Sequence, residues 1–345
     1  MKKFLTGAII VFTMLLTAVG VSAQVNVVVD GEKLELKNEA FIEDGRTLIP
    51  VRAIFEALDA KVLWFEDRRL VVAFSGNSML QIGINSDSLY VNDDEIPLDV
   101  PARIVDDRTY IPLRAVSEAL GAVVDWNDNT RTATIDRQYQ DHFIKTKYVE
   151  DEVVLSDGKT VVNVYLAYPE IENPENNEKI AGFNTYVKDL QQKCFENIKS
   201  DLEDGGFTVK GPNICYFGYE VVTDKNNLLS VLEEGIAIND EGYGNVYSGS
   251  MNYNLSEDAQ SYLLLLEDLL NVTEKDFDIL SLYNFHIDGN RIYFVLDSSY
   301  VPYAQEYGLS EEIYLECSDA NKKLFKIDIT TGETLPYGEP VAIYK

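Results

Sequence analysis

The chain of 345 residues carries 58 acidic and 29 basic side chains, which gives a net charge of −29 at pH 7. This charge excludes nucleic acid and anionic membrane surfaces as partners, because both attract positively charged proteins. It is compatible with a cationic partner and equally with simple solubility, and the length is sufficient for two or three domains.

The first 23 residues have the order of a secretory signal peptide. A charged start precedes an apolar run, and Val21-Ser22-Ala23 places small residues where a signal peptidase cleaves. We therefore expect cleavage between Ala23 and Gln24 and a secreted or cell-surface protein. The alternative is an uncleaved membrane anchor, because no charge occurs between Lys3 and Asp30 and the run is long enough to span a bilayer.

Residues 46–64 and 108–126 carry one motif twice. RTLIPVRAIFEALDAKVLW and RTYIPLRAVSEALGAVVDW are identical at 12 of 19 positions, with an offset of 62 residues. A fixed period indicates a duplicated structural unit. The repeat signature consists of Arg46, Pro50, Arg52, Glu56 and Trp64 in the first copy and Arg108, Pro112, Arg114, Glu118 and Trp126 in the second.

Each copy predicts a hairpin, a short helix and a further hairpin. Pro50 and Pro112 fall in the first helical turn, where the missing N–H costs little. Gly121 ends the second helix, and Asp59 takes its place in the first. Residues 125–129 resemble the opening of a calcium loop but lack its glycine and closing glutamate, so we interpret them as a hairpin turn.

The pattern R-T-x-I-P-x-R-x-x-x-E-A-L-G-A-x-V-x-W, preceded by a strand and Asp-Gly, resembles the copper amine oxidase N-terminal-like (stalk) domain. The resemblance covers residues 24–137. It implies a sheet packed on a helix, a place among exported proteins of Gram-positive anaerobes, and a spacer or wall-proximal role. Copper is not expected, because residues 25–137 contain no histidine or cysteine to bind it.

Residues 138–345 predict a larger α+β domain with an antiparallel sheet and amphipathic helices, with a division into two subdomains near 225–240. An amphipathic helix follows Asn173-Pro174, with apolar residues at steps of three and four from Ile180 to Leu202. Ser256 is expected to cap a second helix that runs to Leu270. Strands are expected at 161–166, 251–255 and 324–329, with a hairpin at 285–294.

Three segments of this part resemble the extracytoplasmic region of the lysozyme-sensing anti-sigma factor and of peptidoglycan deacetylases. They are Tyr168-Pro169-Glu170-Ile171, residues 251–255 (MNYNL) and residues 300–308 (YVPYAQEYG). An anti-sigma factor would need a cytoplasmic sigma-binding segment, but only three residues precede the apolar run. A deacetylase would need a further catalytic domain, for which a chain ending at Lys345 has no room. We therefore expect only the sensing or binding half of such proteins. Residues 241–246 lack the histidine that this family usually has there.

Catalytic and metal sites are not expected. His142 and His286 are the only histidines, and the chain has no Walker loop, G-x-S-x-G, G-x-G-x-x-G or CxxC motif. We therefore expect no enzyme activity, no cofactor and no bound metal. A glycan hydrolase that uses a pair of carboxylates remains as an alternative, because acidic residues are abundant.

The candidate binding residues are Tyr300, Pro302, Tyr303 and Tyr307. Aromatic rings with polar tips suit protein or glycan recognition, and Pro302 with Gly308 indicates a loop rather than a regular strand. The alternative is that the tyrosines are ordinary half-buried strand residues. The three cysteines, Cys194, Cys215 and Cys317, sit in apolar contexts and are interpreted as buried thiols. A Cys194–Cys215 disulfide is the open alternative.

Together these features predict an exported, non-catalytic cell-envelope protein of the α+β class, built from a duplicated stalk and a larger domain. Its expected ligand is a cationic lysozyme-like protein or peptidoglycan. The alternative is a structural or adhesive spacer that associates with the wall and has no soluble ligand.

Overall fold

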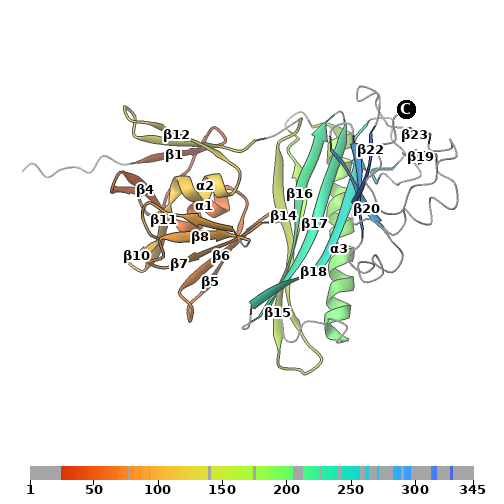
Figure 1. The fold of residues 1–345 in the computed structure, drawn as a ribbon, viewed down its shortest axis with the longest axis horizontal. Helices are drawn as coiled ribbons and strands as arrows, with labels where there is room; N and C mark the ends of the chain where they lie inside the picture. The colour runs from red at the N-terminus through yellow and green to blue at the C-terminus, as the bar shows by residue number, and fades with distance from the viewer. Residues whose placement is uncertain are drawn as a thin grey trace, which may run out of the picture.

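We describe a computed structural model of residues 25–76, 78–92, 94–138, 141–173, 176–204, 213–225, 227–239, 242–256, 261–263, 270–271, 283–288, 291–296, 312–316 and 327–328. The α+β class is confirmed (Figure 1). The predicted signal peptide at residues 1–23 and the tyrosine segment 300–307 lie outside the described residues. No helix within the described residues is both long and apolar enough to cross a membrane.

The two repeats match element for element across residues 26–136, which we call the repeat domain. The first copy has β1 (Asn26–Val29), β2 (Glu32–Lys33), β3 (Phe41–Glu43), β4 (Arg46–Pro50), α1 (Val51–Ala57), β5 (Lys61–Phe65) and β6 (Leu70–Ser75). The second has β8 (Ser88–Val91), β9 (Asp94–Pro97), β10 (Arg103–Val105), β11 (Arg108–Pro112), α2 (Leu113–Ala119), β12 (Val123–Asn127) and β13 (Thr132–Asp136). Only β7 (Ser78–Gly83), which joins the copies, has no counterpart.

The copies are interleaved rather than separate. The three sheets of the domain have the orders β12-β13-β1-β2, β10-β11-β4-β3 and β5-β6-β7-β8-β9, so each contains strands from both copies. Ile49 lies opposite Ile111, its own counterpart, in the antiparallel β4–β11 pair. A local two-fold axis therefore passes through this pair. The predicted sheet-plus-helix units therefore do not form separate sheets within the domain, because each sheet takes strands from both copies.

Both helices lie in the middle of this domain and share its core (Figure 1). Ile54 and Phe55 of α1 pack with Leu113 and Val116 of α2 in one cluster that draws on all three sheets. Pro50 and Pro112 are the N-caps rather than first-turn residues, because each ends the preceding strand with extended backbone. The turn predicted for residues 125–129 is confirmed: the Asn127 side chain accepts from the N–H groups of residues 129 and 130.

The helices end as expected, at a residue with positive φ. Gly121 has φ of 77° after α2, and Asp59 has φ of 56° at the same place after α1. Glycine adopts this conformation without strain, whereas aspartate is one of the few other residues that tolerate it.

The second domain is built on a five-stranded sheet of order β14-β15-β16-β17-β18. Its elements are β14 (Ile144–Val154), β15 (Val161–Ile171), α3 (Glu178–Glu203), β16 (Ile214–Lys225), β17 (Leu228–Asn239) and β18 (Gly242–Asn254). Figure 1 shows α3 running along this sheet. The later strands are β19 (Leu270–Asn271), β20 (Tyr283–Asp288), β21 (Arg291–Leu296), β22 (Glu312–Glu316) and β23 (Ile327–Asp328).

Helix α3 is confirmed, but its start differs from the prediction. Its N-cap is Asn177, whose side chain accepts from the N–H groups of Lys179 and Ile180. Asn173, the predicted cap, instead exchanges two hydrogen bonds of 2.7 Å with the backbone of Asn177. The strands at 161–166 and 251–255 and the 285–294 hairpin are confirmed, and residues 327–328, the described part of the predicted last strand, form β23.

Two further expectations for this domain are wrong. The sheet continues from β16 through β17 to β18, so the described residues place no subdomain boundary at 225–240. The helix expected from Ser256 to Leu270 is contradicted at two of its described residues. Leu263 forms a β-bridge with Tyr253, and Leu270 begins strand β19. Pairing with β18 satisfies the backbone of Leu263 better than an isolated helical turn would.

The repeat domain docks on the second domain through one face of β5, β6 and β7. Val72, Phe74 and Met79 share a core cluster with β15 and β16, and Phe74 stacks on Tyr216 with ring centroids 4.2 Å apart. The Tyr216 hydroxyl also donates to the Gly76 carbonyl at 3.0 Å. The neighbouring Phe217 belongs to a different cluster, with Phe195 of α3, because side chains alternate between the faces of a strand.

Candidate functional site

The repeat domain has a groove of about 900 Å³ beside α2. Its lining comes from α2, from β12 and β13, from the β3–β4 turn and from β9. Repeat-signature residues line it: Arg46, Pro112, Arg114, Glu118 and Trp126. The sequence singled these residues out as structural, and the fold gathers them around one open surface.

Trp126 supplies the aromatic surface of the groove. Its ring packs on the domain core on one side and is partly exposed on the other. The indole Nε1 donates to Asp128 Oδ1 at 2.6 Å, which fixes the orientation of the ring. A ring held in this way offers a flat contact surface at little cost in conformational entropy.

Two ion pairs stand on the rim of the groove. Arg114 Nη1 lies 3.7 Å from Glu118 Oε1, one helical turn along α2. Arg46 Nη2 lies 2.6 Å from Asp99 Oδ2 across the opening. These side chains are about half exposed, and pairs in that setting stabilise a fold by only about 0–1 kcal/mol. Their donors and acceptors are therefore available to a ligand with little loss of fold stability.

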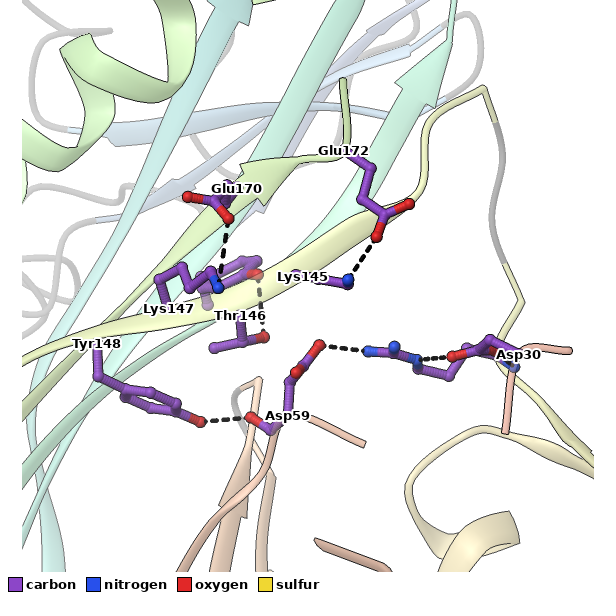
Figure 2. A network of polar contacts seen from close by, with 10 residues as sticks. Asp30, Asp59, Lys145, Thr146, Lys147, Tyr148, Glu170 and Glu172 are labelled. Atoms are coloured by element: carbon purple, nitrogen blue, oxygen red, sulfur yellow. Dashed lines mark hydrogen bonds and ion pairs between the residues drawn. The ribbon is translucent and has the colours of Figure 1, made fainter. Parts of the chain in front are cut away.

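A second, smaller cavity of about 350 Å³ lies where the two domains meet. It is lined from the repeat domain by Leu58, Gly76, Leu120 and Arg137, and from the second domain by His142, Thr146, Tyr219, Glu220 and Asp224, among others. Figure 2 shows the contacts beside it, with the Tyr148 hydroxyl donating to the Asp59 carbonyl at 2.8 Å.

The segment between the domains is anchored at both ends. Arg137 Nε donates to Asp30 at 2.8 Å and its Nη1 donates to Asp59 at 2.7 Å. On the other side, the backbone N–H of His142 donates to Asp224 Oδ2 at 2.6 Å, and its Nδ1 lies 2.5 Å from Asp224 Oδ1. The hydrogen bond to buried Asp224 raises the pKa of His142 above its ordinary value.

This pairing was not foreseen, because His142 and Asp224 are distant in sequence. It orients one imidazole and joins the linker to β16, and it is the geometry of a structural anchor. The described residues contain no cluster of three or more His, Cys, Asp or Glu side chains that could hold a metal ion.

The remaining predicted residues divide between two outcomes. Tyr300, Pro302, Tyr303 and Tyr307 lie outside the described residues, so the structure does not test them. Arg52, Glu56 and Trp64 lie on the exposed face of α1 and β5, and Arg108 lies on β11.

Cys194 and Cys215 are both free thiols, which rules out the disulfide between them in this structure. Burial raises the pKa of the Cys215 thiol to about 12, as expected for a packed rather than a reactive cysteine. Cys317 lies outside the described residues.

Comparison with known families agrees with the repeat-domain expectation. Residues 28–135 match the model of the copper amine oxidase N-terminal domain. No curated protein matches the chain.

Two solved structures of DUF3298 family proteins are similar to parts of the chain. A Bacteroides fragilis protein is 14% identical, covers 45% of this chain and 83% of its own, and has a TM-score of 0.22. A Pseudomonas aeruginosa protein is 15% identical, covers 41% of this chain and 65% of its own, and has a TM-score of 0.25. The resemblance of residues 138–345 to the lysozyme-sensing anti-sigma factor and the deacetylases stays a prediction.

Proposed function

We propose that this chain is an exported, non-catalytic binding protein of the cell envelope, and that the groove beside α2 binds the glycan of peptidoglycan. The observation that carries the proposal is the lining of the groove: one fixed indole ring flanked by the Arg114–Glu118 and Arg46–Asp99 pairs. A sugar ring presents an apolar C–H face and a rim of hydroxyl groups. The indole suits the face, and the charged side chains suit the hydroxyls.

Export is supported by residues 1–23, which have the charged, apolar and small-residue order of a signal peptide. An exported protein of this kind would meet the glycan of the cell wall, and this is why we choose that ligand. The arginines also suit the lactyl carboxylates that removal of the stem peptides frees on the glycan, so the ligand need not be neutral.

The test is a calorimetric titration, in which soluble glycan strands of peptidoglycan are added to the full chain. Arg114→Glu reverses one rim charge on an exposed helix surface, and it is expected to lower the amount of glycan bound at saturation. Tyr90→Ala is the matched control, because this exposed aromatic residue of the same domain does not line the groove. If Arg114→Glu binds as much glycan as the parent, the groove is not the site. If the chain associates with cell walls but binds no soluble glycan, it acts as a spacer.

A cationic, lysozyme-like protein is the second candidate ligand, favoured by the net charge of −29. Titration of hen lysozyme at low and moderate salt distinguishes the cases. One-to-one binding that persists at moderate salt supports this candidate, whereas heat that vanishes with salt is nonspecific attraction to an acidic surface.

A further inference from the structure

The groove beside α2 has a counterpart on the other repeat. Shifting each of its 19 lining residues by 62 positions leads to the exposed face of α1, β5 and the β10–β11 turn. Of the 19, 11 are the same residue type in the other copy. These eleven groove residues are Ile42, Arg46, Thr47, Pro112, Arg114, Ala115, Glu118, Ala119, Val124, Trp126 and Arg131.

The geometry of the two faces also agrees. Trp64 Nε1 donates to Glu66 Oε2 at 2.5 Å, as Trp126 does to Asp128 at 2.6 Å. Arg52 Nε lies 3.8 Å from Glu56 Oε1 along α1, which repeats the 3.7 Å pair of α2. The aromatic ring and the ion pair thus occur in the same arrangement beside both helices.

The α1 face is open to solvent. Trp64 is 38% exposed, and Ile104 is 38% exposed where its counterpart Ile42 is 39% exposed. The second domain contacts the opposite side of β5, through Leu63 and Phe65. The extra strand β7 lies in the middle of its sheet, so β5 remains an edge strand. Its counterpart β12 is also an edge strand, in the β12-β13-β1-β2 sheet.

Fold stability alone does not account for this agreement. Arg52 and Glu56 are more than half exposed, and exposed pairs of this kind contribute about 0–1 kcal/mol. The same duplication has let exposed positions outside the groove diverge, among them Lys33 and its counterpart Glu95. Among the side chains that both copies keep, Val124 and the alanines pack on the core, whereas the charged side chains of the α2 face, Arg114 and Glu118, are exposed where a shared ligand would contact them.

We propose that the face of α1 is a second glycan-binding site, so that one chain holds two glycan segments through equivalent surfaces. This inference rests on the proposed function of the α2 groove and extends it to a bivalent protein. Two linked sites raise the overall avidity for a polymer without any new contact.

The two sites differ in charge at one point. In the groove, Arg46 pairs with Asp99. At the α1 face the counterpart of Asp99 is Lys37, and the counterpart of Arg46 is Arg108. Arg108 donates to the Asp106 carbonyl at 3.3 Å. The α1 face thus has two cations where the groove has a cation and an anion. Binding at this face is expected to favour glycan whose lactyl carboxylates are free because the stem peptides have been removed, and to weaken more with added salt than binding in the groove.

The experiment titrates the full chain with tetrasaccharides of peptidoglycan glycan from which the stem peptides have been removed. We expect two tetrasaccharides per chain for the parent and for Tyr90→Ala. We expect one for Trp64→Ala, one for Trp126→Ala and none for the double variant. Arg52→Glu and Arg114→Glu repeat the test at exposed positions that leave the core unchanged.

The outcomes separate the two proposals. One tetrasaccharide per chain, lost in Arg114→Glu and unaffected by Trp64→Ala and Arg52→Glu, overturns the second site and leaves the proposed function standing. A parent protein that binds no tetrasaccharide overturns both. Two per chain, falling to one in each single-site variant, supports both.

Discussion

Replacing Gly218 with alanine is expected to loosen the docking of the two domains. A Cβ at this position of β16 would lie 2.0 Å from the Gly76 carbonyl oxygen and 2.7 Å from Cε1 of Tyr216. Ordinary contacts begin at 3.4 Å, so the carbonyl would have to retreat by about 1.4 Å, the difference of the two distances. Gly76 has φ of 56° in the tight turn between β6 and β7, which leaves its backbone little room to adjust.

The size of the effect follows from two terms. Overpacking costs about 1–3 kcal/mol. The Tyr216 hydroxyl donates to the same carbonyl, and losing that hydrogen bond adds about 0.5–1.5 kcal/mol. We therefore expect Gly218→Ala to weaken the association of the domains by about 1.5–4.5 kcal/mol.

Small-angle X-ray scattering and limited trypsin digestion measure this effect on the full chain. Separated domains give a larger radius of gyration, and they expose the bond after Arg137 to trypsin sooner. Gly244→Ala is the matched control, because a Cβ there meets nothing within 4 Å. Equal scattering and equal digestion rates for the two variants would refute the docking of β16 on the β6–β7 turn.

Three further predictions concern the linker and α3. Arg137→Ala leaves two partly buried carboxylates of the repeat domain without their shared cation, and it should lower the free energy of unfolding in urea by about 3 kcal/mol. His142 has a raised pKa in the folded state, so its contribution to stability is complete below about pH 6.5 and is lost as the pH rises through the folded pKa. Urea midpoints measured against pH should show this loss in the parent and not in His142→Asn. Asn177→Ala removes the cap of α3 and should cost about 1 kcal/mol in urea denaturation, whereas Asn177→Asp should cost much less.

Local chemistry explains why some elements could be predicted from the sequence. The period of apolar residues from Ile180 to Leu202 specified α3, because burying one face of a helix requires that spacing. Its first residue was missed because Asn173 and Asn177 are both good caps, and only the bonds between them decide which one serves. The helix predicted around Leu263 is wrong for a related reason. The spacing of the leucines suits a helix, but the observed pairing with β18 depends on a strand elsewhere in the chain.

Strand exchange between the repeats could not be predicted, because it depends on pairing between distant segments. The parallel β1–β13 pair joins the two ends of the repeat domain, and nothing in either strand specifies the other. The groove was missed for the same reason. Arg46, Trp126 and Glu118 were recognised as a repeated pattern, but their convergence on one surface appears only when β4, α2 and β12 are brought together.

One feature of the fold was nevertheless present in the aligned repeats. The docking face of the first copy consists of Leu63, Phe65, Leu70, Val72 and Phe74. Their counterparts at the same offset are Asp125, Asn127, Thr132, Thr134 and Asp136. Because alternate residues of a strand share a face, these substitutions turn one whole outer sheet face from apolar to polar. Only the first copy could therefore bury that face against the second domain.

The inward faces of the same strands changed much less. Val62 and Trp64 correspond to Val124 and Trp126, and all four pack on the shared core or border the exposed helix faces. The duplication has thus separated two roles by strand face. The outer face diverged, so that one copy holds a second domain and the other stays solvated. The side that meets the helices kept its tryptophan in both copies, and this is the side on which we place the two glycan sites.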